Sequence, residues 1–161
     1  MYSWSLWGLL TILLVALQIK GGAGSSIWVT VSAGLLCGGV VLLSVKDGKR
    51  DITKSDTLVA ILSLIAIGFW WFANQPIISM LLVIIADGLA FIPTVRKSWQ
   101  QPYSETLSLY VTNALRFFLA LAAVESYTFL SASWTLFWVL LNALFSLMLV
   151  VRRRQLGRET I

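Results

Sequence analysis

Residues 76–95 read PIISMLLVIIADGLAFIPTV, and the basic pair Arg96 and Lys97 follows directly. A membrane hydrocarbon core about 30 Å thick takes roughly 20 helical residues to cross. This stretch supplies 20 residues with a single charged side chain, Asp87. The pattern predicts a helix that spans a membrane and ends at a basic loop.

Apolar segments of similar length fill most of the remaining chain. Of the 161 residues, 58% are hydrophobic and 12% are charged, which is outside the usual composition of a soluble domain. Polar or turn-forming residues separate six apolar segments and precede a basic tail at 152–161. The segments are 3–19, 25–45, 56–73, 76–95, 105–124 and 127–151. We therefore expect an all-α protein, a single polytopic membrane domain of six transmembrane helices.

The basic residues fall on alternate sides of these segments. Cytoplasmic loops retain Lys and Arg during insertion. Ten of the 12 lie after the second, fourth and sixth segments, Lys20 lies alone on the other side, and Arg116 lies inside a helix. The asymmetry predicts a multi-pass protein of the cell (inner) membrane with both termini cytoplasmic. The first segment has no basic region before it, so we expect a retained helix rather than a removed signal peptide.

Several function classes are disfavoured by composition. The chain has no histidine, its seven carboxylates are scattered, and its one cysteine, Cys37, lies in an apolar run. The usual zinc and iron ligand sets and an internal disulfide are therefore not expected. No Walker loop, nucleophile elbow or dinucleotide fingerprint is present. We predict no cofactor and no enzymatic activity. The basic excess lies at helix ends, which favours the lipid bilayer over nucleic acid as a partner.

The stretch 87–108 reads DGLAFIPTVRKSWQQPYSETLS. It contains a proline near a helix end, a short basic loop, and a serine-containing start to the next helix. It resembles the PQ-loop motif of the superfamily that includes the SWEET sugar transporters, with Thr94 where glutamine is usual. The first two and last two helices also share a layout: Trp28 lies four residues before Ser32, and Trp138 four before Asn142.

Residues 49–154 are more closely similar to a group of bacterial seven-helix PQ-loop-like membrane proteins. The likeness rests on DITKSD at 51–56 and on FIPT at 91–94 with RKSW at 96–99. That resemblance implies two parallel repeats in a 3+1+3 arrangement, of which we expect (2)+1+3 here, with the first helix either absent or lost to a misassigned start. The first repeat is then incomplete, and transport requires another chain to fill the gap.

Asp87 and Arg116 are the ionisable residues nearest the middle of predicted helices. A charge at that depth costs about 2.5 to 3.5 kcal/mol on insertion scales. Both lie at similar depths from one face, so we expect an ion pair between the fourth and fifth helices. Two interpretations stay open: a dry pair that fixes helix packing, and a proton-coupling role for Asp87 in transport.

Three uncharged residues, Asn113, Asn142 and Ser32, are further candidates for a small polar solute. Asn142 and Ser32 resemble positions that line the cavity of SWEET proteins, and Asn113 lies one turn from Arg116. Each also fits a simple interhelical contact. Pro93 is either a gating hinge or a static kink.

Other features of the helices leave similar alternatives. Gly34 and Gly38 have GxxxG spacing, which predicts close packing within the chain or in a homo-oligomer. Trp28, Trp134 and Trp138 either anchor the helices at the interface or face the bundle.

Two functions follow from these candidates. One is a small-solute transporter of PQ-loop type with a polar mid-membrane cavity. The other is a non-transporting structural or accessory membrane protein, in which Asp87 and Arg116 form a dry packing pair. A hollow, polar space beside Asp87 favours the first, and a space filled by leucine and phenylalanine favours the second.

Overall fold

The computed structural model describes residues 2–47 and 74–159 and the positions 57, 61, 64, 65, 68, 69 and 72 between them. The described residues contain no strand. Their elements are α1 (Tyr2–Lys20), η1 (Gly24–Ser26), α2 (Ile27–Asp47), α4 (Pro76–Gln100), α5 (Leu107–Ala122) and α6 (Phe129–Glu159). The predicted all-α class is confirmed. The predicted helix at 56–73 lies, apart from those few positions, outside the described residues.

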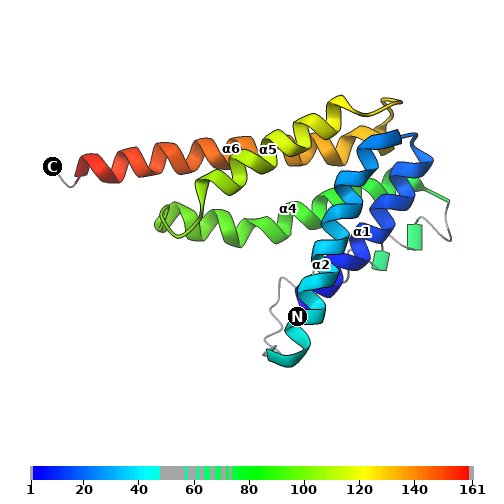
Figure 1. The fold of residues 1–161 in the computed structure, drawn as a ribbon, viewed down its shortest axis with the longest axis horizontal. Helices are drawn as coiled ribbons and strands as arrows, with labels where there is room; N and C mark the ends of the chain where they lie inside the picture. Colours follow the sequence, from blue (N-terminus) through cyan, green and yellow to red (C-terminus); the bar gives the residue numbers. More distant parts are fainter. Residues whose placement is uncertain are drawn as a thin grey trace.

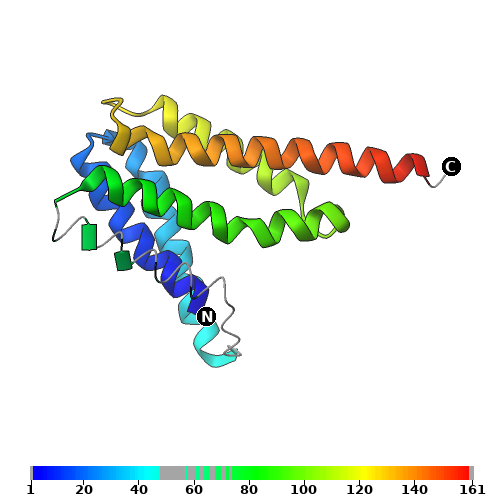
Figure 2. The same cartoon turned by 180° about the vertical axis from the view of Figure 1, so that it is seen from behind.

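The helices form two groups (Figure 1). In one, α5 packs along α6, and α4 packs on α6. In the other, α1 and α2 form an antiparallel hairpin that crosses the first group at one end, as the view from behind also shows (Figure 2). Smaller contacts of α1 with α4 and α6, and of α2 with α5, join the groups.

Two helices extend further than the sequence indicates. α4 continues from the predicted end at 95 to Gln100, and α6 continues through most of the stretch predicted as a basic tail, to Glu159. The stretch predicted as a basic tail is thus helical to Glu159, and its cytoplasmic location stays a prediction. Arginine favours helix, and Arg153 donates hydrogen bonds to the Pro102 carbonyl oxygen at 3.0 and 2.9 Å. These contacts hold the last turns of α6 against the α4–α5 loop.

A glycine turn joins α1 to α2 and contacts the start of α6. Thr128 Oγ1 donates to the Gly21 carbonyl oxygen at 2.8 Å, and the Ser126 amide donates to that of Gly22 at 3.1 Å. A Cβ added at Gly21 would lie 2.7 Å from the Leu130 Cβ. Gly22 has a φ of +76°, which disfavours other residues. Glycine thus permits the close contact between the two helix groups at this end.

The core lies where the hairpin meets α4 and α6. It is built from buried leucines of α1 and from apolar side chains of α4, α5 and α6: Leu10, Leu13, Leu14, Leu17, Met80, Val83, Ala86, Phe117 and Trp134. Within the hairpin, a Cβ added at Gly34 would lie 2.8 Å from Thr11 Cγ2, whereas one at Gly38 would meet nothing within 4 Å. Close packing predicted from the glycine spacing therefore occurs within the chain at Gly34, against α1, and packing of Gly38 against a second subunit stays a prediction.

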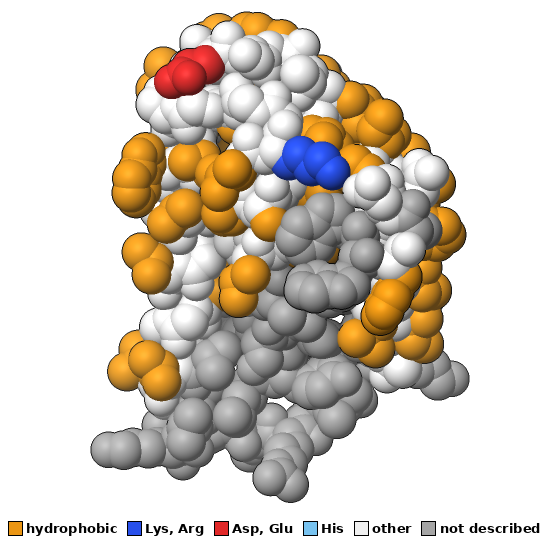
Figure 3. Space-filling model, turned by 90° about the vertical axis from the view of Figure 1, so that its right-hand side faces the viewer, with side chains coloured by type: hydrophobic (Ala, Val, Ile, Leu, Met, Phe, Trp, Pro, Cys, Tyr) orange, Lys and Arg blue, Asp and Glu red, His pale blue; other side chains and the backbone are white. Residues whose placement is uncertain are grey.

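The outer surface of the helices is apolar. One face of α6 carries an exposed stripe of Leu136, Leu140, Leu144, Leu147 and Val151. At 1.5 Å per residue this stripe is about 22 Å long. Figure 3 shows hydrophobic side chains spread over the visible described surface, with two small charged spots. Soluble monomers rarely expose apolar surface on this scale, so the stripe indicates contact with lipid or with another chain.

Two of the described helices are long and apolar enough to cross a membrane: Pro76–Gln100, and Phe129–Leu156 within α6. Shorter apolar stretches of the described side chains occupy Leu10–Lys20, Gly24–Gly39 and Leu107–Ala122. These helices support an association with a membrane.

Candidate functional site

A cavity of about 470 Å³ lies where the α1–α2 hairpin meets α4, α5 and α6. Its lining combines apolar side chains with four of the five polar residues nominated from sequence. The lining residues are Leu10, Thr11, Leu14, Ala33, Leu36, Cys37, Asp87, Leu109, Asn113, Arg116, Phe117, Trp134, Trp138 and Asn142. Mostly apolar walls with a few convergent polar groups are typical of small-molecule sites.

Asp87 enters the cavity wall from the middle of α4. Its Oδ2 accepts hydrogen bonds from the indole Nε1 of Trp134 at 2.7 Å and from that of Trp138 at 3.3 Å. The two tryptophans are one turn apart on α6, so both indoles face the same carboxylate. Asp87 is 6% exposed. A buried acid is therefore stabilised by two neutral donors from one helix.

Aromatic contacts hold these indoles in place. The Phe117 ring of α5 stacks on Trp138, with 5.9 Å between ring centroids and 17° between planes. It meets Trp134 edge-on at 5.6 Å. Such pairs add about 0.5–1.5 kcal/mol beyond the area they bury. The donors to Asp87 are thus fixed by packing between α5 and α6.

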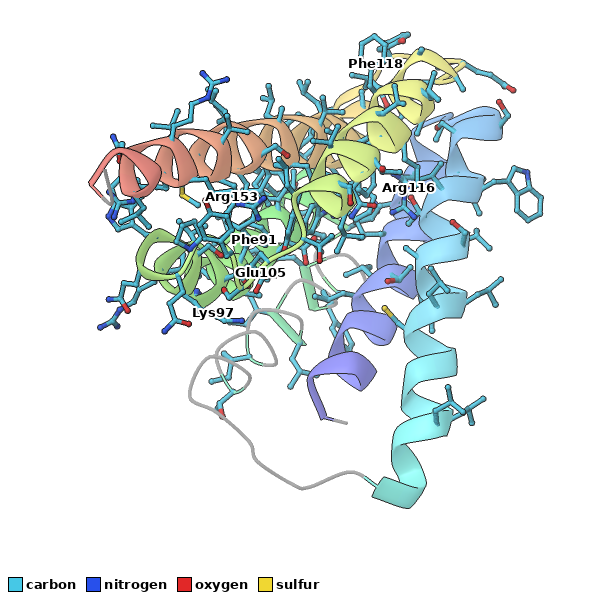
Figure 4. The ribbon with its side chains drawn as sticks, turned by 60° about the vertical axis from the view of Figure 1, so that its left-hand side comes forward. Phe91, Lys97, Glu105, Arg116, Phe118 and Arg153 are labelled. Atoms are coloured by element: carbon cyan, nitrogen blue, oxygen red, sulfur yellow. The ribbon has the colours of Figure 1, made fainter. Side chains whose placement is uncertain are left out.

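The predicted ion pair between Asp87 and Arg116 does not form. Asp87 is paired with the indoles instead, and the salt bridge recorded among the described residues is Lys97–Glu105. The Arg116 Cζ lies 4.7 Å from the centroid of the Phe117 ring. In Figure 4, Arg116 extends from α5 toward the α1–α2 hairpin, whereas Phe118 points outward. Asp87 and Arg116 face one cavity without contacting each other.

The uncharged candidates separate into two groups. Asn113 and Asn142 line the cavity. Asn142 is 2% exposed, and its Nδ2 donates to the Trp138 carbonyl oxygen at 2.8 Å, one turn back on α6. Ser32 does not line the cavity: it is exposed, and its Oγ donates to the Val29 carbonyl oxygen at 2.8 Å within α2.

The chain matches no protein-family model, no curated protein and no solved structure. The resemblance to PQ-loop proteins therefore stays a prediction, and the site is interpreted from its own geometry.

Pro93 lies outside the main cavity. α4 continues past it to Gln100 although proline lacks the amide that would bond the Leu89 carbonyl oxygen. Pro93 lines a second hollow of about 450 Å³ together with Ile92, Arg96, Lys97, Gln100 and Gln101. Its role as a hinge stays a prediction.

A polar network closes the same end of the bundle, where α4 passes into α5. Glu105 accepts a hydrogen bond from the Lys97 ammonium on Oε1 at 3.1 Å, and one from the Tyr110 hydroxyl on Oε2 at 2.9 Å. Arg153 Nη2 donates to the Glu105 carbonyl oxygen at 2.7 Å. Figure 4 shows Lys97, Glu105 and Arg153 close together at this end. The network joins α4, α5 and α6 through one glutamate.

Trp134, Trp138 and Cys37 line the cavity, although none of them was nominated as a site residue from sequence. The role of Trp134 and Trp138 as donors to Asp87 had a detectable signal, since two tryptophans four residues apart on one helix can reach a single acceptor. Of the three tryptophans left open, these two face the bundle, while Trp28 is 70% exposed. Cys37 is buried, as expected, but it also lines the cavity, which no local pattern indicates.

Proposed function

We propose that the chain is a multi-pass protein of the inner membrane that binds a small solute in the 470 Å³ cavity and carries it across. The observation that carries this proposal is the convergence of Asp87, Asn113, Arg116 and Asn142 on one hollow, although they come from three helices. Polar groups in a membrane domain are costly and usually face a cavity or a pathway. Because they line one cavity, all four can contact the same solute.

The proposed topology has six crossings with both ends in the cytoplasm. It is supported by the alternation of basic loops and by the apolar outer faces of the helices. The basic end of α4, with Arg96 and Lys97, is then cytoplasmic. A PQ-loop-like (2)+1+3 arrangement fits the division into a hairpin and a three-helix group, and the proposed carrier then includes a second chain that completes the first repeat.

The proposed mechanism is alternating access by rocking of the hairpin against the three-helix group. Carriers of this kind place the solute between two bundles that move as rigid bodies. The cavity lies between α1 and α2 on one side and α4, α5 and α6 on the other. Movement at this junction exposes the polar residues first to one face of the membrane and then to the other.

The alternative function, a non-transporting structural protein, is supported by the way in which Asp87 is already hydrogen-bonded and buried. Its carboxylate has two indole donors and is almost fully buried, as expected of a group that fixes helix packing. In that case the cavity is dry and no solute enters. The two functions therefore differ in whether water reaches the cavity.

The native Cys37 tests this difference. It lines the cavity, whereas its neighbour Gly38 is exposed outside it. In lipid nanodiscs, we expect a membrane-impermeant thiol reagent to modify Cys37, and to leave a Gly38→Cys variant of the Cys37→Ser chain unmodified. A lipid-soluble maleimide should modify both, which controls for folding and thiol state. Failure of the impermeant reagent at Cys37, with maleimide still reacting, would favour the dry structural protein.

A further inference from the structure

Arg116 is a cation without an acceptor in the described part of the molecule. It is half-buried and lines the cavity, and its recorded contact is with the Phe117 ring. Its Nε is shut off from solvent and has no hydrogen-bond partner among the described residues. Charged groups in protein interiors are normally paired, and the ring face compensates only part of the charge. The cavity therefore presents a positive charge that is free to bind an anion.

Asp87 is not the anionic partner of Arg116. Its Oδ2 is held by the two indoles of α6, which orient the carboxylate and stabilise its negative charge. Arg116 approaches the same cavity from α5 without forming an ion pair with it. Asp87 is thus stabilised by neutral donors, and the guanidinium of Arg116 remains available to a ligand.

The walls around Arg116 favour a ligand with an apolar body. Phe117 and Trp138 form a stacked aromatic pair at the cavity, and Leu10 and Leu109 add aliphatic surface. Asn113 lies one turn before Arg116 and lines the same space, where its side-chain amide adds a hydrogen-bond donor. A volume of about 470 Å³ is within the range of small-molecule sites.

We infer that the solute is an amphipathic organic anion, whose carboxylate is bound by Arg116 and Asn113 and whose apolar or aromatic body packs on Phe117 and Trp138. This inference rests on the proposed function of the cavity. A guanidinium presents two parallel N–H donors that match both oxygens of a carboxylate. A neutral ligand of the same shape could accept one hydrogen bond from Arg116 but would leave its positive charge uncompensated.

The test compares two probes of nearly equal shape, indole-3-acetate and its neutral amide, indole-3-acetamide. Either ligand in the cavity should shield Cys37, which lines it, from N-ethylmaleimide. In phosphatidylcholine nanodiscs we expect the carboxylate to protect Cys37 at a concentration about tenfold to a hundredfold lower than the amide, the ratio typical of one hydrogen-bonded charge. The cation tryptamine should not protect.

Variants test whether Arg116 causes the difference between the carboxylate and the amide. Arg116→Gln should raise the protecting concentration of the carboxylate to about that of the amide, and should change protection by the amide much less. Arg116→Lys keeps the charge without the paired donors and should fall between the two. Lys20→Gln removes an exposed cation outside the cavity and is the matched control, for which no change is expected.

The outcomes separate the two proposals. Equal protection by acid and amide in the unmodified chain would overturn the anion inference and leave a solute cavity in place. Failure of the impermeant thiol reagent to modify Cys37, with N-ethylmaleimide still reacting, would overturn the proposed function, and the inference with it. Nanodiscs that contain phosphatidylglycerol test a lipid source of the anion: protection by this lipid, without protection by indole-3-acetate, would overturn a soluble organic anion as the ligand.

Discussion

Replacing Trp134 by phenylalanine tests the arrangement of the buried acid. The indole Nε1 of Trp134 donates the shorter of the two bonds to Asp87, at 2.7 Å. A hydrogen bond to a charged group contributes about 1.5–3 kcal/mol, whereas one between neutral groups contributes about 0.5–1.5 kcal/mol. Trp134→Phe removes this donor and also some packing against Phe117. We expect its total cost in unfolding free energy to exceed the hydrogen-bond contribution alone.

A double-mutant cycle with Asp87→Asn separates the two contributions. The amide keeps the shape and an acceptor oxygen but removes the charge, so the packing cost of Trp134→Phe is common to both backgrounds and cancels. The remaining coupling should be about 1–1.5 kcal/mol, the difference between charged and neutral acceptors. The assay is unfolding in mixed micelles of a neutral detergent and SDS, followed by circular dichroism.

Trp138→Phe is the matched control on the same helix. Its bond to Asp87 is 3.3 Å long, beyond the usual range for N–H···O contacts. We expect a coupling with Asp87→Asn below about 1 kcal/mol, because a longer bond is weaker. A coupling larger than that of Trp134, or a Trp134 coupling below about 0.3 kcal/mol, would refute the assignment of Trp134 as the main donor.

Three further variants probe the framework around the cavity. Arg153→Met removes the hydrogen bonds to carbonyl oxygens of the α4–α5 loop; it should cost about 1.5–3 kcal/mol in SDS unfolding, and Arg153→Lys should restore only part. Gly21→Ala places a Cβ against the start of α6 and should cost about 1–3 kcal/mol, whereas Gly38→Ala, with open space around it, should be neutral or stabilising in the same assay. Lys97→Gln removes the exposed partner of Glu105 and should change thermal stability in detergent by less than about 1 kcal/mol; a larger loss would mean that this ion pair is essential to the bundle.

The positions of the helices were largely predictable because apolar runs of about 20 residues, separated by polar residues, mark them in the sequence. The predicted segment 76–95 and helix α4 begin at the same residue, Pro76. The end of α6 was not predictable by this rule. Its basic turns are polar, and they remain helical because arginine side chains bind carbonyl oxygens at the end of α4 and in the α4–α5 loop.

The sequence predicted which charged residues line the candidate site, but it did not predict which residues contact one another. Rarity of charge within apolar segments identified Asp87 and Arg116, and helical depth placed them at one level. Depth in the helix does not determine how each helix is rotated about its axis. This rotation determines which side chains contact one another. The rotation of α6 brings Trp134 to Asp87 instead. Ser32 was nominated by analogy with Asn142, and the two face different surroundings.

The sidedness of Cys37 labelling tests whether the cavity opens alternately to the two faces of the membrane. The single native cysteine lines the cavity between the two helix groups. An impermeant thiol reagent is applied to sealed vesicles of right-side-out and of inverted orientation. A carrier with alternating access predicts modification of Cys37 from both faces, with each reaction slowed by a ligand of the cavity. Modification from neither face, or from one face alone under all conditions, would contradict alternating access at this site.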